Sequence, residues 1–264
     1  MSQSEIEKIE TDSVGGLRIR GWEITSSHRP ILSNAAIEHH AAELGFNVPE
    51  MIFGDNYLRL HHIPSGKALE LRALDALRMV DTGPLSAKAV QVSIARDWAE
   101  SRSTLGLTDI KPFDWTFSTL YRGSATALEF SASQRGIDYD RLKVREDILF
   151  YDENVLFEDD LGDNGTSQLS YKVRVMPSGF FALMRFFLRV DGVLFRIYDT
   201  RLYHRFGSDS IVREFSSREM PFDDVKNLLP KKKPDDEDLS LLNNIPFVDS
   251  VIGNPTVECE VATI

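Results

Sequence analysis

Strand-like apolar runs with a turn signal between them dominate the second half of the chain. Two apolar runs, FFALMRFFLRV and VLFRIYDTRLYH, flank the dipeptide Asp191-Gly192. This arrangement predicts a β-hairpin with a two-residue type I′ turn, because both central residues of that turn must adopt positive φ. The register that follows pairs four residues before the turn with four after it: Val190 with Val193, Leu188 with Phe195, Phe186 with Ile197, and Met184 with Asp199.

The two faces of this hairpin differ in character. Side chains alternate across a strand, so one face is apolar as far as Asp199 and belongs in a core. The other face carries a row of three arginines, Arg185, Arg189 and Arg196.

Helical periodicity appears earlier in the chain. Ile37, Ala41 and Leu44 recur at helical spacing after Ser33, and Gly45 stands where a left-handed cap is expected. A second helix is predicted over residues 86–102, anchored by Trp98. Short helices are also expected at DALRMV and at YDRLKVRE.

The remaining patterned segments read as strands. Residues 57–62 and 67–71 alternate around Pro64-Ser65-Gly66 and predict a hairpin with a loose turn. Residues 113–121 predict a half-buried strand that ends at a turn at Arg122-Gly123. A mostly antiparallel sheet with a few flanking helices gives an α+β fold class.

Length and composition fit one soluble globular domain. The chain has 264 residues, a formal net charge of −11 and 42% apolar residues, which disfavours nucleic-acid binding and disorder. We expect a flexible N-terminus over residues 1–14, one domain over 15–222 and a charged, flexible tail over 223–264. The single cysteine, Cys259, excludes an internal disulfide and favours a reducing compartment. Neither a signal peptide nor a membrane span is indicated.

The common catalytic motifs do not occur in this sequence. It lacks GxxxxGK[ST], GxGxxG, GxSxG and HExxH, so no cofactor is expected. Within each of its two His-His pairs the adjacent side chains point in different directions, so no metal site is expected either. The acidic segment YDENVLFEDDLGDNGTS lacks the spacing of a calcium loop, and we read it as a solvated loop that turns at Asn164-Gly165. Composition and motifs favour a binding protein over an enzyme.

Several blocks together resemble one known family. They are PEMIFGDNYLRL, DALRMV, KPFDWTFSTLYRG, VLFEDDLGDNGTSQLSYKVRVMPSGFFALMRFFLRVDGVLFRIYDTRLYH and REFSSRE. In order and spacing they resemble the Tip forty-one-like (TIPRL) family of TOR signalling regulators, from about Arg18 to Glu219. The resemblance implies a non-catalytic regulator that binds the catalytic subunits of type 2A protein serine/threonine phosphatases and inhibits or sequesters them.

The resemblance also implies four partner-contacting residues, which fall on Asp75, Ile137, Ile197 and Asp199. Each has a simpler structural interpretation as well. Asp75 could cap the helix at DALRMV, Ile137 could be a core residue rather than an exposed loop residue, and Ile197 lies in the predicted apolar row. Asp199, where that row ends, is the strongest candidate for contact.

The arginine row suggests a separate hypothesis. Guanidinium groups bind carboxylates through paired hydrogen bonds, so this face could receive the carboxylate at the end of the phosphatase tail. The alternative is that the arginines pair with acids of the chain itself, such as Glu146 or Glu158.

Two other function classes stay open at this point. One is a small-molecule enzyme with a β-rich pocket that uses Asp75, Asp199 or His204, and the other is a signalling scaffold that docks through the segment after Lys231. For the regulator we expect a protein that is monomeric alone, binds no nucleic acid or membrane, and resides in the cytoplasm with access to the nucleus.

Overall fold

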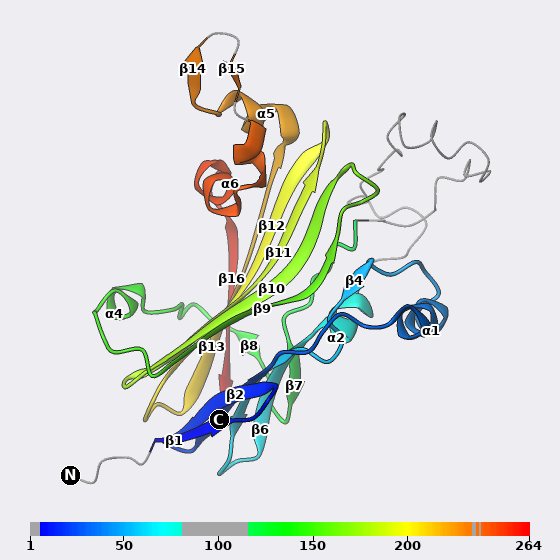
Figure 1. Cartoon of the computed structure of the whole chain (residues 1–264). Helices are drawn as coiled ribbons and strands as arrows, with labels where there is room; N and C mark the ends of the chain where they lie inside the picture. Colours follow the sequence, from blue (N-terminus) through cyan, green and yellow to red (C-terminus); the bar gives the residue numbers. More distant parts are fainter. Residues whose placement is uncertain (1–5, 81–115, 234–235, 238) are drawn as a thin grey trace.

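The computed structural model describes residues 6–80, 116–233, 236–237 and 239–264. Two antiparallel sheets form its body (Figure 1). The smaller sheet has the strand order β1-β2-β3-β5-β6-β7. Its strands are β1 (Glu7–Glu10), β2 (Val14–Ile19), β3 (Trp22–Ser27), β5 (Tyr57–His62), β6 (Lys67–Arg72) and β7 (Ser124–Thr126).

The larger sheet has the strand order β4-β9-β10-β11-β12-β13-β16-β8. Its strands are β4 (Met51–Ile52), β9 (Phe150–Asp159), β10 (Gly165–Met176), β11 (Gly179–Val190), β12 (Leu194–Arg205), β13 (Ser210–Pro221), β16 (Thr256–Thr263) and β8 (Ser131–Ala132). Two short strands, β14 (Lys231–Lys233) and β15 (Asp236–Glu237), pair separately.

Short helices lie at the edges and on the faces of these sheets. They are α1 (Asn34–Leu44), α2 (Ala73–Leu77), α4 (Tyr139–Leu142), α5 (Phe222–Asn227), the 3₁₀ helix η2 (Leu239–Asn243) and α6 (Ile245–Val251). The predicted α+β class with mostly antiparallel strands is confirmed. In the described residues, no helix combines the length and the apolar character that crossing a bilayer requires.

The main core lies between the two sheets. Side chains such as Trp22, Ile24 and Leu60 from the smaller sheet pack with Phe180 and Phe186 from the larger one, and all are nearly or fully buried. We call the face of the larger sheet that points into this core the inner face. The opposite, outer face carries α4 and α6 (Figure 1).

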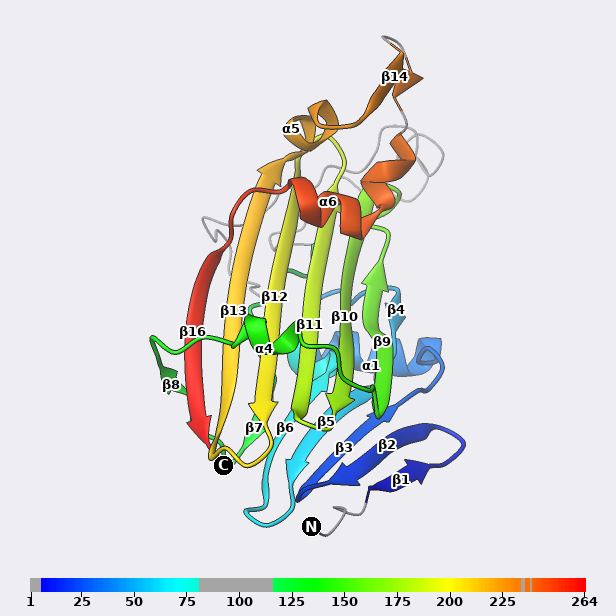
Figure 2. The same ribbon diagram turned by 90° about the vertical axis from the view of Figure 1, so that its left-hand side faces the viewer.

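Two smaller apolar clusters form on the outer face. The first joins Phe187, Phe195 and Ile197 of the sheet to Val225, Val248 and other residues of α5, η2 and α6. We call these three helices the C-terminal cap. The second cluster joins Ile137, next to α4, to Tyr203 and Val212. Figure 2 looks onto the outer face, where α6 crosses the upper ends of the strands and α4 crosses them lower down.

The local predictions of the first half are largely confirmed. Ser33 is the N-cap of α1 and accepts a hydrogen bond from the Ala36 amide, while Gly45 ends the helix at φ 77°. The hairpin of β5 and β6 forms as expected, and α2 follows directly. The predicted helix over 86–102 lies outside the described residues.

The predicted turn at Asp191-Gly192 is wrong by one residue. Val190 pairs with Leu194, so Val193 joins the turn, which has three residues. Gly192 alone takes positive φ there, at 72°. This type of loop is common when a left-handed residue forms a bulge next to the turn. The whole of β12 is consequently shifted by one position against the prediction, which exchanges its two faces.

Three further expectations need correction. Residues 116–121 form no strand, because Phe117 turns the chain at φ 56° and only a single bridge joins Thr119 to Val80. Residues 151–159 of the acidic segment belong to strand β9 rather than to a solvated loop, and Asp159 is buried, whereas the chain does turn over residues 161–164, before β10 begins at Gly165. The helix expected over YDRLKVRE is the single turn α4.

The expected flexible ends also differ from the structure. β1 pairs with β2 within the expected N-terminal segment, and β16 pairs with β13 over eight positions. Between β13 and β16, residues 222–252 contribute five buried apolar side chains, three of them in the helices of the cap. The structured part therefore extends well past residue 222, because apolar residues that are spaced irregularly in the tail meet an apolar patch of the sheet.

Candidate functional site

A buried carboxylate stands at the centre of the outer face. Asp199, in the middle of β12, is 0% exposed. Arg185 donates to it from Nε at 2.7 Å and from Nη2 at 2.8 Å. Arg201 donates from Nη2 at 2.6 Å, and Arg218 Nη2 lies 3.5 Å away. We call Arg185, Arg201 and Arg218 the arginine cluster. It stabilises the buried charge of Asp199, which would otherwise be very costly.

A second carboxylate reaches the cluster from the C-terminal cap. Asp249 of α6 pairs with Arg218 and lies 3.3 Å from Nη2 of Arg185. The backbone carbonyl of Asp249 also accepts a hydrogen bond from Arg218 Nη1 at 3.1 Å. Burial alone would raise the pKa of Asp249, but Arg185 and Arg218 outweigh that effect and hold its pKa below the usual value.

The strand register explains why these residues meet. Arg185 on β11 and Ser216 on β13 both lie directly opposite Asp199. Arg201 stands two positions along β12 and Arg218 two positions along β13, so their side chains point to the same face. Arg201 also donates to Ser216 Oγ at 3.0 Å, which fixes its orientation. Four strand-borne side chains thus converge without any loop.

Charge and exposure define what this site can bind. Three guanidiniums contact two carboxylates, those of Asp199 and Asp249, and a third carboxylate, Glu214, lies opposite Arg201 on β13. The side chain of Arg201 is 21% exposed, whereas Lys172, on the same face of β10, is paired with Glu153 at 2.8 Å. The Nε atom of Arg218 is buried and has no hydrogen-bond partner within the described residues. These features suit an acidic group supplied by a partner.

A further acid anchors the segment around α4. Glu214 on β13, opposite Arg201, is buried and accepts hydrogen bonds from the Ile137 amide at 2.6 Å and from the Tyr139 hydroxyl at 2.5 Å. Burial, followed by the contact with Glu214, raises the pKa of Tyr139. The lower part of the outer face is therefore held by one carboxylate and the upper part by the arginine cluster.

Three of the four residues implied by the family resemblance share this face. Ile197 and Ile137 flank the site of Asp199 on either side, under the cap and beside α4 respectively. Their side chains are 0% and 7% exposed, so both are buried as the simpler interpretation proposed. Their role in partner contact stays a prediction.

Asp75 lies elsewhere. It stands in α2, which follows the smaller sheet on the other side of the molecule (Figure 1). It does not cap the helix, because its side chain accepts a hydrogen bond from Ser124 Oγ at 2.5 Å and pairs with Arg78 at 3.0 Å. The structure does not bring it to the arginine cluster.

The predicted row of three arginines on one face is wrong. Arg185 and Arg189 lie on the outer face, but the one-residue shift of β12 turns Arg196 to the inner face. There Arg196 is almost fully buried, 2.9 Å from Glu219 and 2.6 Å from Ser118 Oγ. The alternative is confirmed in that all three arginines pair with acids of the chain itself. The partners are not Glu146 and Glu158, however: Arg189 pairs with Asp191, and Glu146 binds Ser178.

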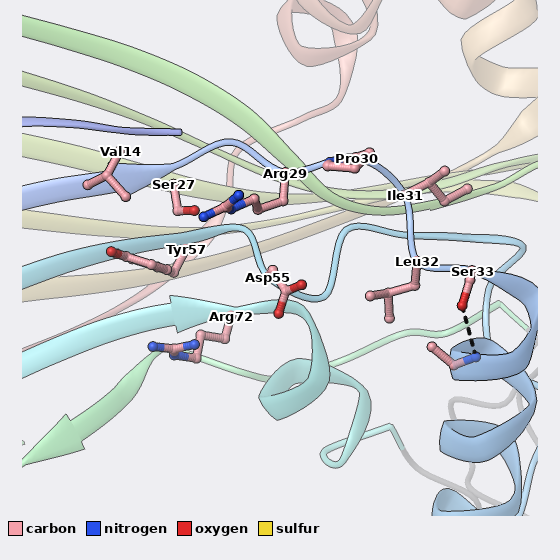
Figure 3. Close-up of a pocket in the computed structure, with 11 residues that line it drawn as sticks. Val14, Ser27, Arg29, Pro30, Ile31, Leu32, Ser33, Asp55, Tyr57 and Arg72 are labelled. Carbon is pink, nitrogen blue, oxygen red and sulfur yellow. Dashed lines mark hydrogen bonds between the residues drawn. The ribbon is translucent and has the colours of Figure 1, made fainter. Parts of the chain in front are cut away.

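The residues considered for an enzyme do not form a common site. Asp199 points outward, whereas His204 on the same strand points inward and packs 4.8 Å from Trp22, measured between ring centroids. Asp75 lies in α2, next to the smaller sheet. A hollow of about 650 Å³ lies near the start of α1. Arg29, Asp55 and Arg72 are among the residues that line it (Figure 3). None of the predicted site residues lines it.

Comparison with known proteins identifies the family. The TIP41-like family profile matches residues 51–226. The chain belongs to the TIP41-like family. It is 44% identical to the TIP41-like protein of Homo sapiens over 216 residues, which cover 79% of this chain and 78% of the human protein.

Two yeast relatives carry more specific names. The type 2A phosphatase activator TIP41 of Saccharomyces cerevisiae is 37% identical over 230 residues, or 79% of this chain and 64% of that protein. The type 2A phosphatase activator tip41 of Schizosaccharomyces pombe is 32% identical over 213 residues, or 79% of this chain and 83% of that protein. The TIP41-like profile covers the whole arginine cluster and ends before η2 and α6.

Sequence reasoning missed Arg201, Arg218, Glu214 and Asp249 as members of this site. The first three could have been found from a correct hairpin register, since alternation then places them on the outer face with Asp199. Asp249 offers no such signal, because its position depends on how the cap folds back over the sheet.

Proposed function

We propose that this TIP41-like chain is a non-catalytic regulator that binds the catalytic subunit of type 2A serine/threonine phosphatases through its outer face. The proposal includes inhibition or sequestration of that subunit within TOR signalling. The two yeast relatives named as type 2A phosphatase activators support the choice of enzyme. The arginine cluster supports the choice of surface.

The observation that carries the proposal is the buried Asp199 with its three guanidiniums. A fully buried carboxylate held by ion pairs costs stability compared with apolar packing, so its presence on a sheet face calls for a role beyond folding. The gathered guanidiniums, with Arg201 partly exposed, suit an acidic segment, including the carboxylate that ends a protein chain. Charged contacts of this type also speed association and fix orientation.

Calorimetry at fixed salt tests the interaction and its surface together. The full chain is titrated with a purified type 2A catalytic subunit, beside the variants Arg201→Ala and Arg18→Ala. Arg18 lies on β2 of the smaller sheet and is 47% exposed, so it controls for the loss of one surface arginine. We expect Arg201→Ala to weaken binding about tenfold or more and Arg18→Ala to leave it unchanged.

Three outcomes are informative. Loss with Arg201→Ala alone supports the partner and the surface. Equal binding by all three proteins keeps the partner and rejects the outer face. Absence of binding by the wild-type chain rejects the partner.

A phosphatase assay determines the direction of regulation. Activity of the catalytic subunit is measured against rising concentrations of the chain, and we expect it to fall. A rise would instead indicate activation, which is the term in the names of the yeast relatives. Recovery of the complex from the cytoplasmic fraction of cells, before and after inhibition of TOR kinase, tests the pathway and the compartment.

A further inference from the structure

The C-terminal cap covers the upper part of the proposed binding surface. Ile197 is fully buried beneath it, together with Phe187 and Phe195. Val248 of α6 and Val225 of α5 are likewise fully buried on the cap side. In addition, Phe222 stacks on Phe195 with ring centroids 5.5 Å apart and planes within 6°. A partner can touch Ile197 only when the cap moves.

Polar contacts hold the cap at three points of the outer face. Asp249 binds Arg185 and Arg218, and Asn243 of η2 accepts a hydrogen bond from Arg189. All three arginines belong to strands of the sheet. The cap therefore supplies its own acidic and amide groups to the cations that face outward.

From this geometry we infer that α6 occupies, within the same chain, the place of an acidic partner segment. Asp249 acts as the internal carboxylate for Arg185 and Arg218, and Val248 fills the apolar position above Ile197. This inference rests on the proposed function, because the competing segment belongs to the phosphatase catalytic subunit. The cap and that segment exclude each other, so partner affinity is reduced by the fraction of chains in which the cap is closed.

Two observations favour displacement over a permanent lid. Asp249 is 34% exposed, so water reaches the ion pairs that hold α6. Once α6 moves away, water can solvate the Asp249 carboxylate, which lowers the cost of breaking these ion pairs. The family profile also ends at residue 226, so η2 and α6 lie outside the part that defines the family.

Point variants test this better than truncation. Deleting residues 223–264 would also remove β16, which pairs with β13 along the sheet. Asp249→Asn removes the charge that holds α6, and Val248→Ala weakens its apolar contact without any change of charge. Asp223→Asn, at an exposed position of α5, controls for the change in net charge.

The experiment measures affinity for the type 2A catalytic subunit by calorimetry, with hydrogen exchange of residues 245–252 as a second readout. We expect Asp249→Asn and Val248→Ala to bind about three- to tenfold more tightly than wild type, and Asp223→Asn to match wild type. Both cap variants should exchange faster over 245–252, and wild type should do so once the partner is bound.

Other results overturn the inference in distinguishable ways. If wild type binds but both cap variants bind equally or more weakly, the cap is no competitor and the proposed function stands. If Asp249→Asn alone binds more tightly while the exchange stays slow, local charge and not cap release is responsible. If none of the proteins binds the catalytic subunit, the inference fails together with the proposed function.

Discussion

Arg185 and Asp199 lie directly opposite each other on β11 and β12, and the guanidinium donates two hydrogen bonds to the carboxylate, of 2.7 and 2.8 Å. This paired geometry is the strongest that the two groups can form. Because Asp199 is fully buried, the contact fixes the centre of the outer face as a rigid element. Arg201 and Arg218 are then positioned around a carboxylate that does not move.

The first prediction concerns the stability that this contact provides. In Asp199→Asn, three guanidiniums lose their shared buried carboxylate, and we expect the free energy of unfolding to fall by about 3–5 kcal/mol. Urea denaturation followed by fluorescence measures it. Asp191→Asn is the matched control, because Asp191 also pairs with an arginine but is 44% exposed, and its loss should cost less than about 1 kcal/mol. Equal losses in the two variants would contradict the central role of Asp199.

The same pair shows where sequence reasoning succeeds and where it fails. The alternation of apolar residues identified both strands of the hairpin, and the Asp-Gly signal located the turn. Neither feature distinguishes a two-residue from a three-residue loop, because Gly192 accepts positive φ in both. That one residue decides whether Asp199 faces Met184 or Arg185, and hence whether it ends an apolar row or centres an arginine cluster.

Local signals gave other elements correctly. Ser33 and Gly45 correctly marked the two ends of α1, because helix capping depends on residues close in sequence. In contrast, the cap and β16 depend on contacts with distant strands, such as Phe222 on Phe195. Long-range packing of this type leaves no period in the sequence, so the segment after 222 looked like a tail.

The second prediction concerns pH and His204. Burial, aided by His62 nearby and opposed by the hydrogen bond to the Ser210 carbonyl, lowers the pKa of His204. The unfolded chain takes up a proton below a pH of about 6.5, whereas the native state resists it. This group's contribution to stability is therefore present above that pH and is lost as the pH falls below it.

Urea midpoints at pH 7.5 and 5.5 test this for wild type and His204→Gln. The fall in stability on acidification should be smaller in the variant, since glutamine does not titrate. His39→Gln, at an exposed position of α1, should behave as wild type. An identical fall in all three proteins would show that His204 is not responsible.

The third prediction concerns Asp159, whose contribution to stability increases, rather than decreases, as the pH falls. Burial raises the pKa of Asp159 to about 6, although it accepts hydrogen bonds from the amides of Glu50 and Leu161. As the pH falls from 7 through 6, the native state binds a proton that the unfolded chain does not yet take up. Wild type should therefore gain up to about 3 kcal/mol between pH 7 and 4 relative to Asp159→Asn.

The measurement is the pH dependence of the unfolding free energy in each protein, not its value at one pH, because the amide also loses a hydrogen bond. Asp160→Asn is the control, since the neighbouring carboxylate is exposed. A constant difference between wild type and Asp159→Asn across this range would refute the assignment.

The fourth prediction concerns the start of β10. Gly165 has φ +156°, and a Cβ added there would lie 1.9 Å from the carbonyl oxygen of Arg189. Since backbone cannot yield as a side chain does, Gly165→Ala should cost about 2–4 kcal/mol. Gly192→Ala, at φ +72° in open space, should cost about 1 kcal/mol. Thermal unfolding of the two variants checks the difference, and similar melting temperatures would argue against the close β10–β11 approach.

The last prediction separates the two arginines that the shifted register places on opposite faces. Arg196 lies buried on the inner face against Glu219 and Ser118, so Arg196→Ala should lower the free energy of unfolding by about 2–4 kcal/mol and leave the affinity of the folded protein for the phosphatase unchanged. Arg201→Ala should lower the affinity and leave the stability almost unchanged, because its partly exposed guanidinium faces outward while Arg185 and Arg218 still hold Asp199. Denaturation gives the free energy of unfolding of each variant, and calorimetry gives its affinity for the phosphatase. A loss of affinity with Arg196→Ala at temperatures where it is fully folded would contradict the assignment of partner binding to the outer face alone.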